Sequence, residues 1–115
     1  QGRPGVIAAR AAAPAEPAAA DRVTELDPAG LAEGTRLVQL GAFDTPDIAR
    51  AEWERLTDRF PEFLDGRARV IQEASSGGSA FYRLRAHGFE DLAASRRFCA
   101  ALVAQNAACI PVTVR

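Results

Sequence analysis

Residues 36–43 (RLVQLGAF) show the alternation of side chains that a β-strand requires. In an extended chain, successive side chains face opposite sides of the strand. One side of this strand would carry Leu37, Gln39, Gly41 and Phe43, and the other side would carry Val38, Leu40 and Ala42. Apolar residues occur on both sides, so the pattern predicts a strand that is buried over most of its length.

The segment after this strand has the spacing of a helix. Thr45, Pro46 and Asp47 combine an N-cap residue, a proline suited to the first turn and an acid that interacts favourably with the helix dipole. Apolar residues then recur at helical spacing, and Pro61 ends the helix. The buried stripe predicted for this helix is Ala49, Trp53, Leu56 and Phe60.

Two β-prone runs follow, residues 67–74 and 80–86, on either side of a short Ser/Gly segment. Such a pair predicts a β-hairpin. A last β-prone run, residues 109–114, contains Pro111, which favours an edge position because proline cannot donate to a neighbouring strand.

A second helix is predicted between the hairpin and the last strand. Glu90 and Asp91 place negative charge at its start, and Asn106 marks its end. Its buried stripe would be Ser95, Phe98, Cys99 and Leu102.

The order strand, helix, strand, strand, helix, strand predicts an α+β fold of the split βαββαβ type, as in ferredoxin-like proteins. In this fold a four-stranded antiparallel sheet carries two helices on one face. The opposite face is left to solvent or to a ligand, so functional residues are expected there.

Residues 1–33 differ from the rest of the chain. They are rich in Ala and Pro and contain too few large apolar side chains to offset the entropy of ordering, so we expect a flexible linker. Asp27 followed by Pro28 indicates a short helix near residues 28–33. The folded domain would comprise residues 34–115.

Composition narrows the class of function. The formal net charge of the 115 residues is −1, and all 14 basic residues are arginine. Nucleic acid is therefore not an expected partner, since its binding proteins are usually basic. No apolar run approaches the roughly 18 residues of a membrane span, so any membrane anchor or export signal would lie outside this segment.

An enzymatic or metal site is hard to assemble from this sequence. The single histidine, His87, lies in a predicted turn beside Gly88, where a histidine is more often structural than catalytic. Two cysteines and one histidine do not give the ligand spacing of a zinc site. We expect no catalysis, no metal and no cofactor.

The two cysteines can lie close together. Cys99 is on the buried stripe of the second helix, and Cys109 begins the strand that returns beneath it. In an oxidising compartment a disulfide closing this short loop would contribute roughly 2–3 kcal/mol. Two reduced thiols in a core are the alternative, and the spacing alone leaves both open.

The uncovered face of the sheet carries the candidate binding residues. If Val38, Leu40, Tyr82 and Leu84 face the helices, the opposite face carries Gln39, Phe43, Phe81, Arg83 and Arg85. An amide, two aromatic rings and two guanidinium groups suit a neutral polymer rich in hydroxyl and amide groups. The alternative interpretation is that the two rings are edge core and the arginines only keep the surface soluble.

The chain resembles a SPOR domain, the sporulation-related repeat module of bacterial cell-envelope proteins, over residues 34–115. LVQLGAF resembles the first strand of that family, TPDIARAEWERL its first helix, YRLRAHGF its third strand and turn, and SRRFCAALVAQNAACIPV its second helix and last strand. The order and spacing of these segments are more specific than any one of them.

This resemblance implies a function. SPOR domains bind peptidoglycan glycan strands that lack stem peptides, usually at the division septum, without catalysing a reaction. The resemblance also implies a periplasmic location and an inner-membrane anchor beyond the Ala/Pro linker. Separately, we expect the module to be a monomer. Many family members carry a cysteine pair like Cys99 and Cys109, which favours the disulfide.

The resemblance implies that Gln39, Ala42 and Phe43 contact the glycan, together with the neighbourhood of Phe81 and Arg83. Arg85 joins this set by its position on the same face of the strand. Many members have Ser in place of Ala42, so one hydroxyl contact is absent here. The family's Gly-Pro-Phe turn is replaced by His87-Gly88-Phe89, which changes the rim of the site.

Other functions share this topology. Readers of single-stranded RNA have the same strand order, but their Lys/Arg-Gly-Phe/Tyr signature is missing here and the domain is not basic. A small enzyme of the acylphosphatase type would need a phosphate loop and an asparagine that are not visible. A protein-interaction module of the cell-division machinery, which docks a partner on the open sheet or on an edge strand, stays open as the alternative.

Overall fold

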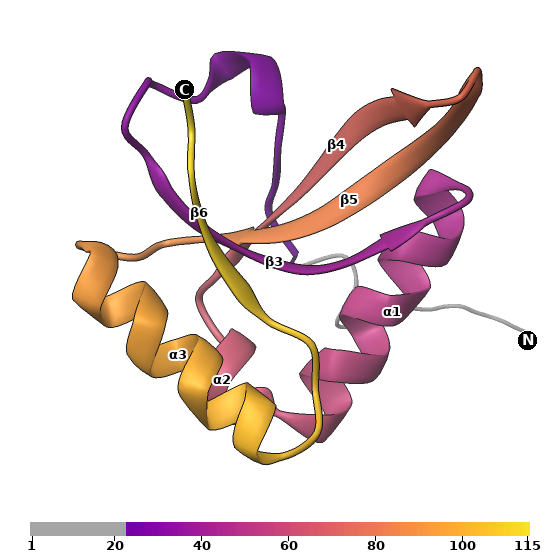
Figure 1. Cartoon of the computed structure of the whole chain (residues 1–115). Coiled ribbons are helices and arrows are strands. Elements are labelled where there is room, and N and C mark those ends of the chain that lie inside the picture. Colours follow the sequence, from indigo (N-terminus) through magenta and orange to yellow (C-terminus); the bar gives the residue numbers. More distant parts are fainter. Residues whose placement is uncertain (1–22) are drawn as a thin grey trace, which may run out of the picture.

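The computed structural model describes residues 23–115. Five strands form one sheet in the order β2-β4-β5-β3-β6. They are β2 (Glu25–Leu26), β3 (Arg36–Phe43), β4 (Ala68–Ser76), β5 (Ser79–His87) and β6 (Ile110–Thr113). Helices α1 (Pro46–Arg59), α2 (Pro61–Leu64) and α3 (Leu92–Ala104) lie together on one face of the sheet (Figure 1).

The predicted α+β fold and its βαββαβ order are confirmed. Strands β4, β5, β3 and β6 pair antiparallel, as expected for the four-stranded sheet. The sheet differs from the prediction by a fifth strand, because β2 pairs in parallel with the outer edge of β4. A further short helix, α2, begins at Pro61, directly after α1 ends.

Local sequence signals position both long helices. The Thr45 hydroxyl accepts a hydrogen bond from the Ile48 amide at 3.1 Å, and the Asp91 carboxylate accepts one from the Ala94 amide at 2.8 Å. These caps satisfy amides that the first turn leaves without a partner. Helix α3 ends before Asn106, whose φ of 67° is left-handed and stops the helix where the sequence predicted.

The hairpin is longer than its β-prone runs. Strands β4 and β5 stay paired up to Ser76 and Ser79, so Gly77 and Gly78 alone form the turn. Their φ angles are 58° and 85°, the combination of a type I′ turn, which glycine adopts without steric cost. The predicted Ser/Gly loop is therefore mostly strand.

The core lies between the sheet and the helices. Both predicted stripes are buried, and they pack on the residues of β3 and β5 that face them: Val38, Leu40, Leu84 and Ala86. A disulfide between Cys99 and Cys109 links α3 to the residue before β6, with the two Cα atoms 4.9 Å apart. The disulfide implied by the family resemblance is confirmed.

Residues 23–34 belong to the folded unit. The Glu25 carboxylate binds Arg50 of α1 at 3.0 Å and Arg69 of β4 at 2.7 Å, which fastens β2 to the sheet edge. A short 3₁₀ helix, η2 (Pro28–Gly30), follows within the predicted helical stretch 28–33. The folded unit therefore includes residues upstream of the expected boundary at residue 34, and the rest of the predicted linker, residues 1–22, lies outside the described residues.

Helix η2 lies on the face of the sheet opposite α1, α2 and α3 (Figure 1). Leu37 and Val70 are buried there, at 1% and 0% exposure, yet they are not part of the core beneath the helices. Leu37 and η2 residues line the same pocket, and Val70 pairs in register with Leu26. The face that was expected to be uncovered is thus covered over part of its area.

Candidate functional site

This face of the sheet carries two rows of side chains across three strands. In the register of the sheet, Arg85 of β5 lies between Gln39 of β3 and Val70 of β4. One pleat further along, Arg83 lies between Ala42 and Gln72. Directly opposed residues in a sheet share a face, so the strands bring two amides and two guanidinium groups together.

Phe43 is not part of this face, and its predicted orientation was wrong. The β3–β5 register shifts between Gln39 and Gly41, where a β-bulge adds one residue to β3. Beyond the bulge, Ala42 pairs with Arg83 on the open face, while Phe43 pairs with Tyr82 and packs against the core. The prediction assumed strict alternation along residues 36–43. The bulge breaks this alternation, so Ala42 and Phe43 lie on the faces opposite to those predicted.

Gly41 accommodates the bulge by leaving room for the Phe43 ring. A Cβ atom at position 41 would lie 2.7 Å from Cζ of Phe43, closer than a van der Waals contact allows. The missing side chain lets the ring lie against the strand on the helix side. A glycine inside a strand pattern is a known signal for a bulge, so the sequence did contain this information.

Arg85 is held in place by Gln39. Its Nε and Nη2 atoms both donate to Oε1 of Gln39, at 3.1 and 3.0 Å. Burial lowers the pKa of the Arg85 guanidinium, and the nearby positive charge of Arg83 lowers it further. Arg85 is therefore a fixed cation whose charge is only partly solvated.

Arg83 is oriented by an aromatic ring. Its guanidinium carbon lies 5.2 Å from the centroid of Phe81, two residues before it on the same face of β5. This is the geometry of a cation–π contact. Phe81, Arg83 and Arg85 therefore form one line along β5, as the sequence predicted.

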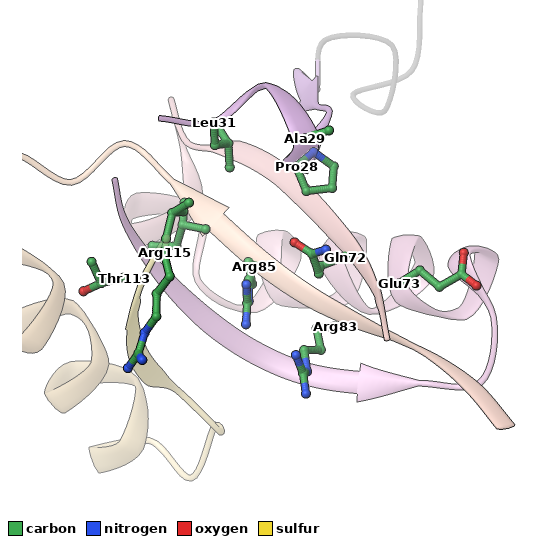
Figure 2. A pocket seen from close by; sticks show the side chains of 11 residues that line it. Pro28, Ala29, Leu31, Gln72, Glu73, Arg83, Arg85, Thr113 and Arg115 are labelled. Atoms are coloured by element: carbon green, nitrogen blue, oxygen red, sulfur yellow. The ribbon is translucent and has the colours of Figure 1, made fainter. Parts of the chain in front are cut away.

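A groove of about 530 Å³ lies over Arg83 and Arg85, while Phe81 and Gln39 are outside its lining. Leu37, Arg83 and Arg85 form its floor; η2 borders it on the side of β4, and the end of β6 borders it on the opposite side (Figure 2). Its full lining is Pro28, Ala29, Leu31, Leu37, Gln72, Glu73, Arg83, Arg85, Thr113, Val114 and Arg115.

Sequence reasoning missed several of these residues for different reasons. Gln72 lies opposite Arg83 in the hairpin, so counting back from the Gly77–Gly78 turn would have placed it on the same face. Pro28 and Leu31 gave no such signal, because their position depends on the long-range pairing of β2. Gln39, Phe81, Arg83 and Arg85 share one face as the strand pattern predicted, and the bulge adds Ala42, which only the family resemblance had assigned to the site.

The described part of the chain offers little for other chemistry. Within residues 23–115, no three His, Cys, Asp or Glu side chains are grouped closely enough to hold a metal ion. His87 lies at the end of β5, opposite Leu37 and Ala68. No helix in this part of the chain is long and apolar enough to cross a membrane.

Comparison with protein families identifies the fold. The family model of the SPOR domain matches residues 32–113, which is most of the chain. The chain belongs to the SPOR domain family. The match begins just after η2 and includes every strand that forms the groove floor.

A curated relative supports this membership. The SPOR domain is similar to the cell division protein FtsN of Caulobacter vibrioides, with 28% identity over 72 residues. That alignment covers 63% of this chain and 27% of the relative, so the chain corresponds to about a quarter of that protein.

Among solved structures, the SPOR domain resembles the solution structure of the peptidoglycan binding domain of the B. subtilis cell wall lytic enzyme CwlC. The TM-score is 0.51 at 15% sequence identity, over 74% of this chain and 95% of that domain. At this identity the likeness shows a shared fold.

Proposed function

We propose that this SPOR domain binds peptidoglycan through the groove, and that its ligand is a glycan strand without stem peptides. Its role is to bring the protein that carries it to the division septum in the periplasm, as a monomeric and non-catalytic module. Family membership, the division protein among its relatives and the peptidoglycan-binding domain that shares its fold all support this proposal.

The observation that carries the proposal is the Gln39–Arg85 pair beside Arg83 and Phe81 on one open face. The Gln39 amide and the guanidinium groups present hydrogen-bond donors to the hydroxyl and acetamido groups of a sugar chain. The Phe81 ring offers an apolar surface to a sugar ring. No group in this set is a nucleophile, which fits reversible binding.

The shape of the groove suits a thin polymer. Its volume of about 530 Å³ lies within the roughly 300–1,000 Å³ of typical ligand sites. Leu31 borders it on one side and Val114 on the other. A bare glycan strand fits between such borders more readily than a strand with a peptide branch on every second sugar.

The proposal is tested by sedimenting the domain with purified sacculi, either intact or stripped of peptides by an amidase. We expect strong co-sedimentation with stripped sacculi only. Arg83→Ala and Gln39→Ala should reduce it, whereas Arg97→Ala, an exposed arginine of α3 on the other side of the sheet, should not. Equal binding of all variants, or no binding to stripped sacculi, would contradict the proposed site.

A second candidate function is docking of a division protein at the sheet edge. Strand β6 pairs with β3 only over Arg36–Gln39, so within the described residues the rest of that edge of β3 has no strand beside it. Ile110 is 60% exposed there. This function would be favoured if a purified division protein bound the domain, Ile110→Asp abolished that binding, and stripped glycan did not bind.

A further inference from the structure

The side chains that line the groove carry an excess of positive charge, and no ion pair within the described residues neutralises it. Three of the 11 residues that line it are arginines, and one, Glu73, is an acid. Within residues 23–115, ion pairs involve Arg50, Arg55 and Arg69, whereas Arg83, Arg85 and Arg115 form none. The chain as a whole has a net charge of −1, so this cluster is a local feature.

Neutral partners hold the two central arginines in place. Arg85 donates to an amide oxygen of Gln39, and Arg83 lies over the Phe81 ring. Both partners fix the direction of a guanidinium group without supplying a negative charge. Figure 2 shows the two side chains extending from β5 toward the same side.

Two like charges at alternate positions of one strand repel each other. This repulsion adds to burial in lowering the pKa of Arg85. An anion bound to both guanidinium groups would remove the repulsion and accept several charge-assisted hydrogen bonds. The floor of the groove thus has the composition of a carboxylate or phosphate site.

The proposed ligand provides such a group. In peptidoglycan, the stem peptide is attached by an amide bond to the lactyl ether of N-acetylmuramic acid. Hydrolysis of that bond releases the peptide and leaves a carboxylate, one negative charge per disaccharide. A glycan strand that still carries peptides has a neutral amide at the same position.

We propose that Arg83 and Arg85 bind the lactyl carboxylate of N-acetylmuramic acid. This inference rests on the proposed function and adds its chemical basis. The domain distinguishes stripped from intact strands in two ways. Removal of the peptide creates a negative charge on the strand, and it also removes the bulk of the peptide. The residue types alone suggested a neutral polymer, whereas this inference assigns a negatively charged group to the ligand.

The test uses three soluble glycan preparations: strands with peptides, amidase-stripped strands, and stripped strands whose carboxyl groups have been converted to methylamides. The methylamide is neutral but small, so it separates charge from size. We expect the methylamide strands to bind roughly ten- to a hundredfold more weakly than the carboxylate strands in a calorimetric titration. Added salt should narrow this difference because it screens the charged contact.

The possible results separate the two proposals. Equal binding of carboxylate and methylamide strands, both tighter than peptide-bearing strands, would overturn the carboxylate inference and leave the proposed function standing. Absence of binding to all three would overturn the proposed function itself. Preference for the carboxylate strands supports both.

Arginine variants test which residues recognise the carboxylate. Arg83→Gln and Arg85→Gln should bind carboxylate and methylamide strands almost equally, whereas Arg97→Gln on α3 should keep the full preference. Arg85 is partly buried, so Arg83→Gln decides the outcome if the Arg85 variant does not fold. Full carboxylate preference in a folded Arg83→Gln protein would overturn the assignment of this residue.

Discussion

The two faces of the sheet use the same strands for different purposes. On β5, Leu84 and Ala86 are fully buried against the helices, while Arg83 and Arg85, which alternate with them, lie on the opposite face, in the groove. The helix-covered face is stabilised by core packing and by the Cys99–Cys109 disulfide. Mutations at neighbouring residues of β5 should therefore have different effects: loss of stability on the helix-covered face and loss of binding on the opposite face.

The largest expected effect is on the covered face. Leu84→Ala should lower the free energy of unfolding by about 2–5 kcal/mol, because it leaves a cavity at a site with 0% exposure. Its neighbour Arg83→Ala should change stability by less than about 1 kcal/mol and affect glycan binding instead. Urea denaturation and sacculus sedimentation of both variants measure this contrast. Similar stability losses in both would break it.

Reduction of the disulfide should have the next largest effect on stability. The two cysteines are 10 residues apart, and closing a loop of this size contributes about 2–3 kcal/mol. The urea midpoint should fall when dithiothreitol is added, and the Cys99→Ser/Cys109→Ser double variant should show no further fall. Glycan binding by the fraction that stays folded should not change, because the disulfide lies on the helix side.

Phe43→Ala tests which face this ring occupies. The ring is half-buried against the core, so its removal should cost about 1–2 kcal/mol of stability and leave glycan affinity unchanged. Phe81→Ala is the matched variant on the open face and should do the reverse. Loss of binding without loss of stability in Phe43→Ala would contradict the bulge in β3.

The smallest expected effect is the pH dependence of the Glu25 cluster. Hydrogen bonds from Arg50, followed by those from Arg69, lower the pKa of Glu25 in the folded state. A lowered pKa stabilises the fold above the ordinary range of glutamate, and this contribution disappears as the pH falls through the folded-state value.

Glu25→Gln should therefore be less stable than the wild type near neutral pH by about 0.5–1 kcal/mol, since the ion pairs are partly exposed. Below the folded-state pKa of Glu25 the two proteins should be equally stable, because both side chains are then neutral. Urea denaturation across this range measures the difference. Glu54→Gln, on the exposed side of α1, is the control and should follow the wild type at every pH.

Much of the architecture could be predicted because it depends on local signals. The caps at Thr45 and Asp91, the helical stripes and the glycine turn determine where elements begin and end. The alternation along β5 placed Phe81, Arg83 and Arg85 on one face. Strand parity was reliable there because the β4–β5 pairing has no irregularity.

The remaining features depend on contacts distant in sequence. Strand β2 has only two residues and no pattern of its own; its position depends on Glu25 meeting Arg50 and Arg69. The bulge after Gln39 exchanges the faces of Ala42 and Phe43. Gly41 is a local signal for a bulge, but the pairing with β5 determines where the extra residue lies. These two features turn an expected flat surface into a bordered groove.

The place of β2 has a mechanical consequence. Tension applied to the chain upstream of residue 23 would reach the β2–β4 pairs and the Glu25 ion pairs first, at the outer margin of the sheet. The η2 segment would be pulled next, and β5, with its two arginines, would be shielded from the force by β4. Under such tension the domain would lose the η2 border of the groove before the strand that carries the two arginines is displaced.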